Sequence, residues 1–317
     1  MSKLSSPRDA YGKTLVRLGH ENKDIVVLDG DLSKSTKTCL FGNDKDLCER
    51  FFDCGIAEQN MMGIAAGLAA SGKTVFASSF AVFAVGRCFD QLRMSIAHAE
   101  LNVKIVATHA GISVGEDGVS HQAMEDLALA CSLPGFTVIV PSDAIETTYA
   151  VETAASTKGP FYIRLGRSEI PEICNNGYRF NLGKAATFRE GSDVTIIAMG
   201  IMVAKALEAA ESLQQIGIDA RILNMATIKP MDEAAIIRAA SETGAIVTAE
   251  EHFVHGGLFS KVAQIVAQNC PVPMGSVAVN DTYARSGKPG ELLEKYGLTA
   301  DVIKEKALAV VERKSNL

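Results

Sequence analysis

The sequence predicts an α/β protein of two domains, each built on a mostly parallel sheet with helices on both faces. Its 317 residues exceed the usual size of a single domain. Short runs rich in β-branched residues alternate with longer stretches of helical periodicity, a pattern typical of parallel sheets. The alternation stops at a turn-rich stretch, 171–177, and then starts again. We therefore expect a first domain at 1–172, a linker at 173–191 and a second domain at 192–317.

Each predicted strand is a short apolar run, and each predicted helix is a longer stretch with apolar residues on one face. In the first domain, the expected strands lie at 25–28, 75–79, 103–108, 138–140 and 161–165. Its expected helices lie at 57–70, 86–99 and 144–156. In the second domain, the expected strands lie at 194–199, 220–225, 246–249 and 277–279. Its expected helices lie at 203–216, 232–243 and 259–267.

The composition is that of a soluble globular protein, with 47% hydrophobic and 21% charged residues. A net charge of −6 argues against a surface for nucleic acid or anionic membranes. The seven cysteines are odd in number and form no Cys-x-x-Cys pair, which favours reduced thiols over a disulfide framework or zinc site. The first residues lack the apolar core of a signal peptide, and the longest apolar run is too short to span a bilayer. We expect a cytoplasmic protein with no nucleic-acid or membrane partner and no metal ligands of its own.

The stretch after the expected strand at 103–108 is the most informative of the chain. It places three glycines, Glu116 and Asp117 between His109 and His121. Because ligands of open α/β sheets bind beyond the carboxyl ends of the strands, this stretch is a candidate site. Two histidines around an acidic pair are typical of a site that moves protons on a polar substrate. An ordinary glycine-rich surface loop is the alternative interpretation.

The expected helix at 57–70 carries a second candidate, Glu58, in its first turn. An acid at this position is also explained by its favourable interaction with the helix dipole. Gly63 and Gly67 lie four residues apart with alanines beside them, so this helix can approach another backbone closely. Glycine inside a helix costs roughly 1 kcal/mol relative to alanine, so we expect tight packing at this face to compensate.

Taken together, these segments resemble one known family. Gly-Ile-Ala-Glu-Gln at 55–59, Ser-Phe-Ala-Val-Phe at 79–83, Thr-His at 108–109 and Gly-Glu-Asp-Gly-Val-Ser-His-Gln at 115–122 have the order and spacing of the transketolase pyrimidine-binding domain. Residues 193–317, with Glu-Glu-His-Phe-Val-His-Gly-Gly at 250–257, are similar to the C-terminal domain of the same family. The Gly-Asp-Gly signature of the N-terminal transketolase domain, with its following asparagine, is not found. The resemblance therefore implies the C-terminal subunit of a split transketolase.

The resemblance implies that this subunit contributes half of a site for thiamine diphosphate. Glu58 matches the glutamate that hydrogen-bonds a ring nitrogen of the cofactor's pyrimidine, and burial is expected to keep its carboxyl protonated. Phe83, with Phe80 close by, matches the ring that stacks on the pyrimidine, although both also suit a plain hydrophobic core. Asp31 resembles an acid near the cofactor and equally a helix cap. The diphosphate and Mg²⁺ are expected mainly on the N-terminal partner.

The substrate implied by the resemblance is a sugar phosphate. His121 matches the residue that handles protons on the substrate oxygens, and Asp117 matches the acid that recognises a hydroxyl next to the reacting carbon. His109 fits a position lining the substrate channel, where Ala110 replaces an aspartate of larger transketolases. Phosphate and nearby oxygens are expected at Arg8, Ser35, Arg164 and Arg167. Arg164 has a competing interpretation, an ion pair at a strand end.

The implied function is transfer of a two-carbon ketol unit from a ketose phosphate to an aldose phosphate, within an α₂β₂ heterotetramer formed with an N-terminal transketolase subunit. Two related enzymes stay open, a 1-deoxyxylulose-5-phosphate synthase type and the beta subunit of the decarboxylating component of a 2-oxoacid dehydrogenase. A non-enzymatic alternative is an assembly or regulatory subunit that keeps the fold. The presence of Glu58, Asp117 and His121 favours an enzyme. His255, just before paired glycines, is a site candidate without an assigned role.

Overall fold

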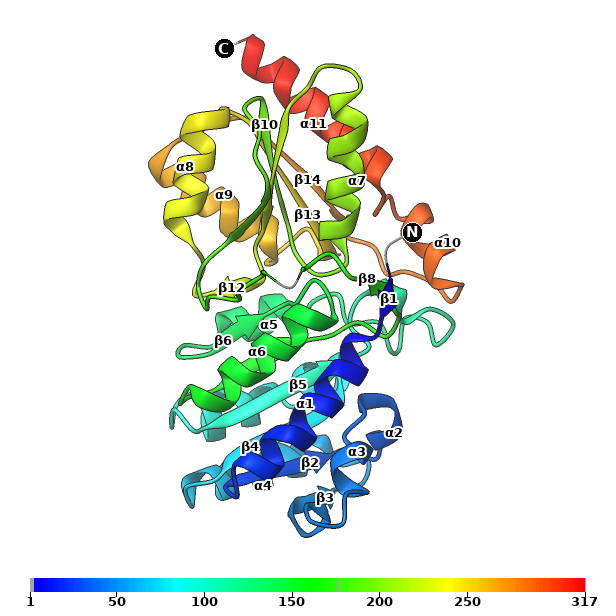
Figure 1. Cartoon of the computed structure of the whole chain (residues 1–317), viewed down its shortest axis with the longest axis vertical. Helices are drawn as coiled ribbons and strands as arrows, with labels where there is room; N and C mark the ends of the chain where they lie inside the picture. The colour runs from blue at the N-terminus through cyan, green and yellow to red at the C-terminus, as the bar shows by residue number, and fades with distance from the viewer. Residues whose placement is uncertain (1–2, 176, 317) are drawn as a thin grey trace.

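Two sheets, set one above the other along the long axis of the molecule, organise the computed structural model of the chain (Figure 1). The structure describes residues 3–175 and 177–316. The N-terminal domain contains a seven-stranded sheet and the C-terminal domain a five-stranded sheet. Both sheets are mostly parallel and carry helices on both faces, so the predicted fold class is confirmed.

The central strands of the seven-stranded sheet are buried along their whole length, as expected for parallel strands covered on both faces. The order across the sheet is β12-β6-β7-β5-β4-β2-β3, and only the β12–β6 pair is antiparallel. The strands are β2 (Ile25–Asp29), β3 (Phe51–Asp53), β4 (Thr74–Phe80), β5 (Val103–Thr108), β6 (Thr137–Ile139), β7 (Phe161–Arg164) and β12 (Thr227–Lys229). The carboxyl ends of β2, β4, β5 and β7 consequently meet at one edge.

Two helical layers cover this sheet. Helices α1 and α6 bury apolar side chains on one face, while α4, α5 and two π-helical segments cover the other. The helices are α1 (Pro7–Glu21), α2 (Ser33–Thr36), α3 (Cys39–Gly42), α4 (Glu58–Ala70), α5 (Asp126–Ser132) and α6 (Ala144–Ser156). One π-helical segment, Gln91–Ala97, lies within the helix predicted at 86–99, and the other, Val82–Gly86, lies directly before it. Short 3₁₀ turns lie at Cys48–Arg50 and Ile112–Val114.

The C-terminal sheet has the order β14-β13-β10-β11-β9, in which β9 alone is antiparallel to its neighbour. Helices α7 and α11 cover one face, and α8 and α9 cover the other (Figure 1). The strands are β9 (Ala186–Arg189), β10 (Val194–Ala198), β11 (Ala220–Asn224), β13 (Ile246–Phe253) and β14 (Met274–Val279). The helices are α7 (Met202–Gln214), α8 (Glu233–Thr243), α9 (Leu258–Asn269), α10 (Pro289–Lys295) and α11 (Ala300–Ser315).

The two domains are joined more closely than the sequence predicted. Strand β12 belongs to the C-terminal half of the sequence but pairs with β6 of the N-terminal sheet. Within the N-terminal domain, β1 (Leu4–Ser5) pairs with β8 (Ile170–Pro171) and brings the two ends of that domain together. The stretch expected as a linker, 173–191, contains β9, which pairs with β11 of the C-terminal sheet. Strands of two to four residues carry too little periodicity to be recognised from sequence.

No helix within residues 3–175 and 177–316 is long and apolar enough to cross a bilayer. The longest, α11, has 16 residues and carries charged side chains along its length.

Candidate active site

The carboxyl ends of the parallel strands bring several predicted residues to one edge of the N-terminal sheet. Phe80, the last residue of β4, pairs in register with Thr108, the last residue of β5, and His109 follows directly. After β2, Gly30 lies beside Glu58, because a Cβ built on Gly30 would lie 3.5 Å from Cγ of Glu58. Residues from separate sequence motifs therefore meet where open α/β sheets place their ligands.

Four rings form what we call the aromatic cluster, namely Phe80, Phe83, His109 and His121. The ring of Phe80 stacks on His109 with centroids 3.7 Å apart and lies parallel to Phe83 at 6.0 Å. The edge of His121 meets Phe83 at 5.3 Å. The hydroxyl of Ser120 contacts Nδ1 of His121 at 2.9 Å. The structure thus brings the predicted cofactor rings and the two predicted histidines together.

His109 is held in a strained and buried position. Its backbone φ of 59° lies in the left-handed region, which non-glycine residues rarely occupy. Its Nδ1 lies 2.8 Å from the hydroxyl of Thr108. Burial lowers the pKa of His109 to about 3, and the nearby charges of Arg8 and Arg167 act in the same direction. The imidazole is therefore neutral at physiological pH and suited to hydrogen bonding rather than to ion pairing.

This neutrality gives a direct prediction for the full-length chain. Because the pKa of His109 is about 3, well below the ordinary value of 6.5, its imidazole should stay neutral throughout the range above pH 5. NMR spectra of ¹⁵N-histidine-labelled protein between pH 8 and pH 5 should show no change in the His109 ring signals. A His109→Asn variant assigns these signals by their disappearance. Titration of the His109 ring near pH 6.5 would contradict the burial of this side chain.

Glu58 begins α4 with a side chain that is only 2% exposed. Its Oε2 accepts a hydrogen bond from Nη1 of Arg87 at 3.0 Å, and the same guanidinium lies 4.4 Å from the centroid of the Phe83 ring. In the structure, Arg87 therefore occupies the hydrogen-bonding edge of the Glu58 carboxyl. Sequence reasoning missed Arg87, since nothing local connects it with a glutamate 29 residues away.

A second group gathers predicted substrate residues beside the aromatic cluster. The guanidinium of Arg8 donates to the backbone carbonyls of Ser35, at 2.6 Å, and Arg167, at 3.0 Å. Arg167 donates to the carbonyl of Val114 at 2.5 Å and lies 3.8 Å from a carboxylate oxygen of Asp117. The structure brings these four predicted residues together, although Ser35 contributes its carbonyl to the contact with Arg8. Two cations and one acid at a strand edge are suited to a phosphorylated polyol.

The loop after β2 carries Asp31, whose φ of 63° is also left-handed. Asp31 is exposed and is not the helix cap of the alternative interpretation, because Leu32 occupies the cap position of α2 and no side chain bonds there. The buried carboxylate of Asp29 instead accepts from the amide of Leu32 at 2.6 Å and from the hydroxyls of Thr36 and Thr38, both at 2.7 Å. Burial raises the pKa of Asp29 to about 6. Asp29 therefore shapes the loop that carries Asp31 and Ser35.

Arg164, which is predicted to contact the substrate, is buried in the structure. Its side chain is 5% exposed, and its Nε donates to Asp126 at 2.7 Å. Its Nη2 donates to the backbone carbonyls of Ala123 and Glu251, each at 3.0 Å. These buried partners engage Nε and Nη2 of the guanidinium, which favours an ion pair over the predicted contact with the substrate. The competing interpretation, an ion pair at the end of a strand, describes what the structure contains.

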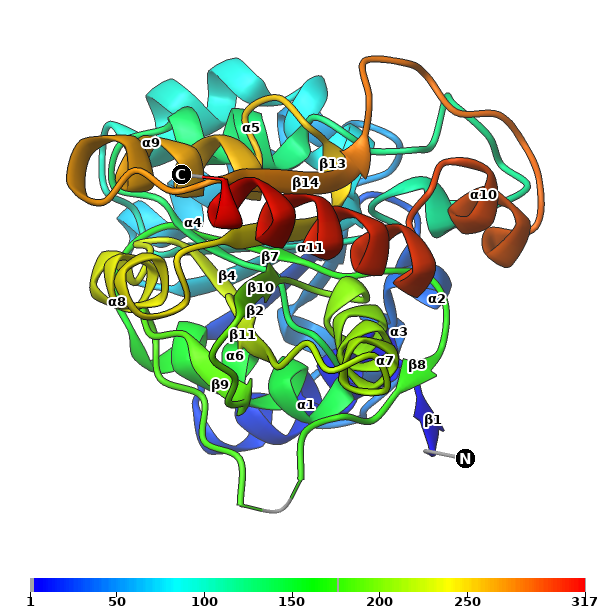
Figure 2. The ribbon, with the colours of Figure 1, turned by 90° about the horizontal axis from the view of Figure 1, so that it is seen from above.

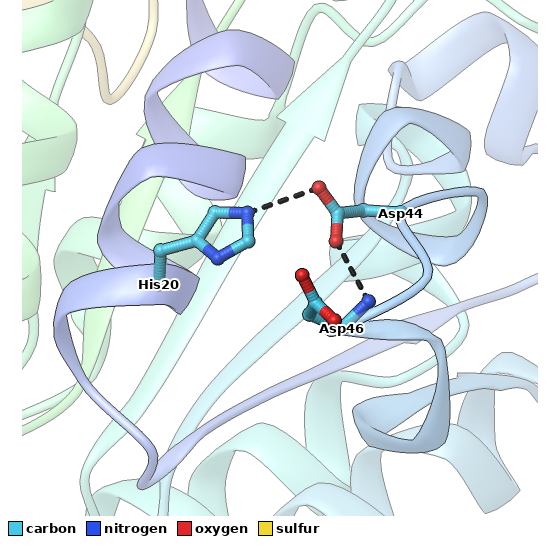
Figure 3. A group of neighbouring side chains, drawn as sticks. All are labelled: His20, Asp44 and Asp46. Atoms are coloured by element: carbon cyan, nitrogen blue, oxygen red, sulfur yellow. Dashed lines mark hydrogen bonds and ion pairs between the residues drawn. The ribbon is translucent and has the colours of Figure 1, made fainter.

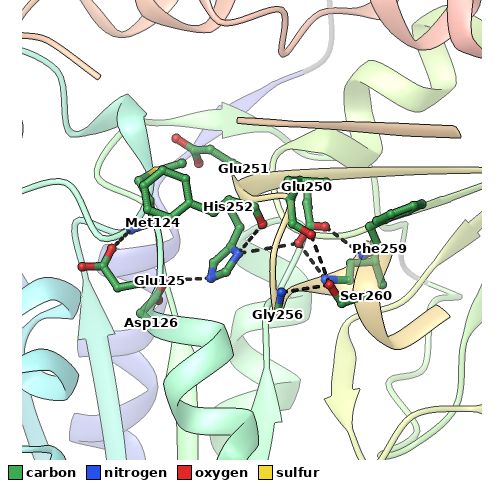
Figure 4. Close-up of polar contacts among 12 residues, drawn as sticks. Met124, Glu125, Asp126, Glu250, Glu251, His252, Gly256, Phe259 and Ser260 are labelled. Carbon is green, nitrogen blue, oxygen red and sulfur yellow. Dashed lines mark hydrogen bonds and ion pairs between the residues drawn. The ribbon is translucent and has the colours of Figure 1, made fainter. Parts of the chain in front are cut away.

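A second polar cluster, not predicted from sequence, lies buried where β13 meets α5 (Figure 4). Nε2 of His252 lies 3.9 Å from Oδ1 of Asp126. Burial lowers the pKa of His252 to about 4, so this ring is neutral. Glu250 accepts from the amides of Leu258 and Phe259 at the start of α9, at 2.7 and 2.8 Å. Glu-Glu-His at 250–252 is part of the resemblance found in the sequence. The contacts of these side chains, however, depend on how the two domains pack against each other.

Two other histidines lie elsewhere. His255 is exposed in the turn between β13 and α9, so the structure does not bring it to the strand edge. His20 lies on α1 with Nε2 at 3.0 Å from Asp44, and the amide of Asp46 donates to the same carboxylate (Figure 3). Among the described residues, these three side chains form a group with metal-ligand spacing. Both oxygens of Asp44 are already engaged inside the group, so it is explained without a metal.

The glycine face of α4 is open. A Cβ built on Gly63 or Gly67 would meet no atom of residues 3–175 or 177–316 within 4 Å. Beside it, the side chains of Ile56 and Ile64 are 78% and 39% exposed. The tight packing expected at these glycines is therefore not made by the described part of the chain.

Comparison with known proteins identifies the family to which both domains belong. Residues 5–172 match the family model of the transketolase pyrimidine binding domain. The chain belongs to the transketolase family. Residues 183–303 match the transketolase C-terminal domain, so both domains of the structure have transketolase counterparts.

Two curated relatives have nearly the same length as this transketolase chain. A putative transketolase C-terminal section from Methanocaldococcus jannaschii is 46% identical over 309 residues, covering 96% of this chain and 96% of the relative. A 6-deoxy-6-sulfo-D-fructose transketolase subunit from a Clostridium species is 44% identical over 308 residues, covering 97% and 95%. A solved structure described as a split gene transketolase, inactive beta4 tetramer, is similar at 53% identity and a TM-score of 0.91, covering 98% of this chain and 99% of that one. The resemblance found in the sequence is confirmed.

Proposed function

We propose that this chain is the C-terminal subunit of a thiamine-diphosphate-dependent transketolase, which transfers a two-carbon ketol unit from a ketose phosphate to an aldose phosphate. The observation that carries the proposal is the guanidinium of Arg87, which contacts both the ring of Phe83 and the buried carboxyl of Glu58. Its carbon lies 4.4 Å from the ring centroid of Phe83, and its Nη1 donates to Glu58 at 3.0 Å. A flat nitrogen-containing group with one hydrogen-bonding edge would make the same two contacts in its place.

The aminopyrimidine of thiamine diphosphate has this shape and chemistry. Glu58 would hold its ring nitrogen, Phe83 would stack on it with Phe80 behind, and Asp31 would lie close to it. The orphaned buried hydroxyl of Ser79, beside Gly30, adds a polar atom at the same edge. When bound, the cofactor supplies a nucleophilic carbon for attack on the ketose carbonyl. The part of Glu58 is to exchange a proton with the ring nitrogen once Arg87 has been displaced from its carboxyl.

The sugar phosphate would lie along the other side of the aromatic cluster. Arg8 and Arg167, with Ser35 nearby, would hold the phosphate, and Asp117 would accept a hydrogen bond from a sugar hydroxyl. Since Ser120 contacts Nδ1 of His121, Nε2 is the nitrogen proposed to exchange protons with the substrate oxygens. His109, held neutral by burial, would hydrogen-bond the substrate in the channel.

We propose an N-terminal transketolase subunit as the partner, in an α₂β₂ heterotetramer, with the diphosphate and Mg²⁺ held mainly by that partner. The open glycine face of α4 supports a subunit contact, because Gly63 and Gly67 allow close approach of a second backbone. The description of the similar split transketolase as an inactive beta4 tetramer supports the view that this type of subunit needs its partner for activity. The seven free cysteines suit the reducing cytoplasm, where we place the enzyme.

The deciding experiment mixes the purified chain with the N-terminal transketolase subunit of the same organism, thiamine diphosphate and Mg²⁺. With xylulose 5-phosphate and ribose 5-phosphate, we expect a seven-carbon ketose phosphate and a three-carbon aldose phosphate, and no product from either subunit alone. Parallel reactions with 6-deoxy-6-sulfo-D-fructose test the sugar named for the Clostridium relative. Consumption of pyruvate instead would favour the deoxyxylulose-phosphate synthase or 2-oxoacid dehydrogenase alternatives. A complex that forms and transfers nothing would favour an assembly subunit.

A further inference from the structure

The segment that carries Asp117 and His121 is the 111–122 loop, between β5 and α5. The amide of Gly111 donates to the carbonyl of Ala123 at 3.0 Å, so the two ends of the loop are tied together. Apart from the short 3₁₀ turn at Ile112–Val114, the loop has no regular secondary structure. Its shape therefore depends on what it packs against.

The C-terminal domain supplies the buried partner of this loop. Oε1 of Glu251, on β13, accepts a hydrogen bond from the amide of Ser113 at 2.7 Å. The carboxylate reaches the loop through Gly111, since a Cβ at that position would collide with it. The φ of Gly111, 82°, is also in the region that glycine tolerates best. Glu251 is 5% exposed, so water cannot readily replace it as the acceptor for this amide.

Other contacts extend the same arrangement. Arg164 donates both to Ala123, at the end of the loop, and to the carbonyl of Glu251. The side-chain amide of Gln122 donates to the carbonyl of Arg285 in the C-terminal domain at 3.1 Å. Viewed from above, the segment that leads into α10 lies beside the 111–122 loop (Figure 2), and a Cβ on Gly118 would collide with Ser286. The loop is thus enclosed by the C-terminal domain on one side.

We propose that Glu251 is a positioning residue, through which the C-terminal domain sets the shape of the 111–122 loop and hence the placement of Asp117 and His121. The inference rests on the proposed function of those two side chains. Glu251 acts through the amide of Ser113. The C-terminal domain then has an indirect part in substrate binding.

The neighbouring acid provides a matched control. Glu250 lies on the same strand, but successive side chains of a strand point to opposite sides. Figure 4 shows the carboxyl of Glu250 directed toward Phe259 and Ser260, away from that of Glu251. Both acids are buried and both accept backbone amides, Glu250 within its own domain and Glu251 across the domain boundary. Substituting each in turn separates loop positioning from general loss of a buried acceptor.

The first measurement is hydrogen–deuterium exchange of the full chain, followed by mass spectrometry of peptides. In Glu251→Ala, the peptide containing Ser113 should exchange about tenfold faster or more, because its amide has lost a buried charged acceptor, while the peptide at the start of α9 should not change. Glu250→Ala should show the reverse. Glu251→Gln should lie in between, since its amide oxygen can accept the same hydrogen bond. Glu251→Leu fills a similar volume without an acceptor and replaces the alanine variant if that variant does not fold.

The second measurement is steady-state kinetics of the complex with the partner subunit. Glu251→Ala should raise KM for the sugar phosphate by about tenfold, with recovery in Glu251→Gln and an unchanged Kd for thiamine diphosphate. Unchanged exchange at Ser113 in Glu251→Ala and Glu251→Leu would overturn the proposal, whatever the enzyme assay gives. Faster exchange at Ser113 with an unchanged KM would overturn it as well. Absence of sugar transfer in the unmodified complex would refute the proposed function, and the exchange data would still decide whether Glu251 holds the loop.

Discussion

A Glu58→Ala chain, assembled with its N-terminal partner, is expected to transfer sugar about 10²–10⁴-fold more slowly. This factor is the usual contribution of acid–base assistance to the rate. Glu58 is buried at the start of α4 beside Phe83, where its carboxyl is the proposed proton partner of the cofactor ring. A Glu58→Gln chain keeps the size and a hydrogen-bond donor but cannot exchange the proton. It should therefore bind thiamine diphosphate better than Glu58→Ala while remaining nearly inactive.

Glu233 supplies the control for this experiment. It also stands in the first turn of a helix, α8, but its side chain is exposed and belongs to the C-terminal domain. If first-turn acids act only on the helix dipole, Glu58→Ala and Glu233→Ala should have similar, small effects. Near-normal turnover of the Glu58→Ala complex would remove the central claim of the proposed function.

The second large effect is expected on stability. An Arg164→Met chain should unfold with a free energy lowered by about 3–5 kcal/mol, because the substitution leaves Asp126 as a buried charge without its cation. Asp126 is 2% exposed, and the hydroxyl of Tyr162 would still donate a hydrogen bond to the same oxygen. Urea denaturation of the full chain, followed by circular dichroism, measures the change.

The double variant Arg164→Met with Asp126→Leu completes this test. Replacing both partners of a buried ion pair by apolar side chains is often close to neutral, so the double variant should recover most of the lost stability. A phosphate-binding role for Arg164 makes a different prediction, namely unchanged stability and a raised KM for the sugar phosphate. That result would favour the predicted contact of Arg164 with the substrate.

The parallel sheets were predictable because each strand is a separate apolar run and each helix shows a helical spacing of apolar residues. The site residues at the ends of β4 and β5 followed from the same pattern, since the strand ends of a parallel sheet share an edge. Arg164 was harder, because a phosphate site and a buried ion pair both require an arginine at the end of a strand. Only the position of Asp126, 38 residues away, distinguishes them.

Other features left no local signal in the sequence. Arg87 reaches Glu58 from a segment next to π-helical turns, whose geometry is not encoded by a simple hydrophobic period. Asp29 is buried, and its carboxylate accepts hydrogen bonds from the hydroxyls of Thr36 and Thr38. The contact of Glu251 with Ser113 joins residues 138 positions apart in different domains. Long-range polar contacts of this kind are set by packing and could not be read from spacing.

Strand β12 has a practical consequence for anyone who divides this molecule. It closes the side of the N-terminal sheet next to β6, although it belongs to the C-terminal half of the sequence. A fragment truncated at residue 175 would leave the amides and carbonyls of β6 bare, a template on which further chains can add and aggregate. Expression of either half alone should therefore give insoluble material, whereas co-expressed halves can reassemble through the shared sheet.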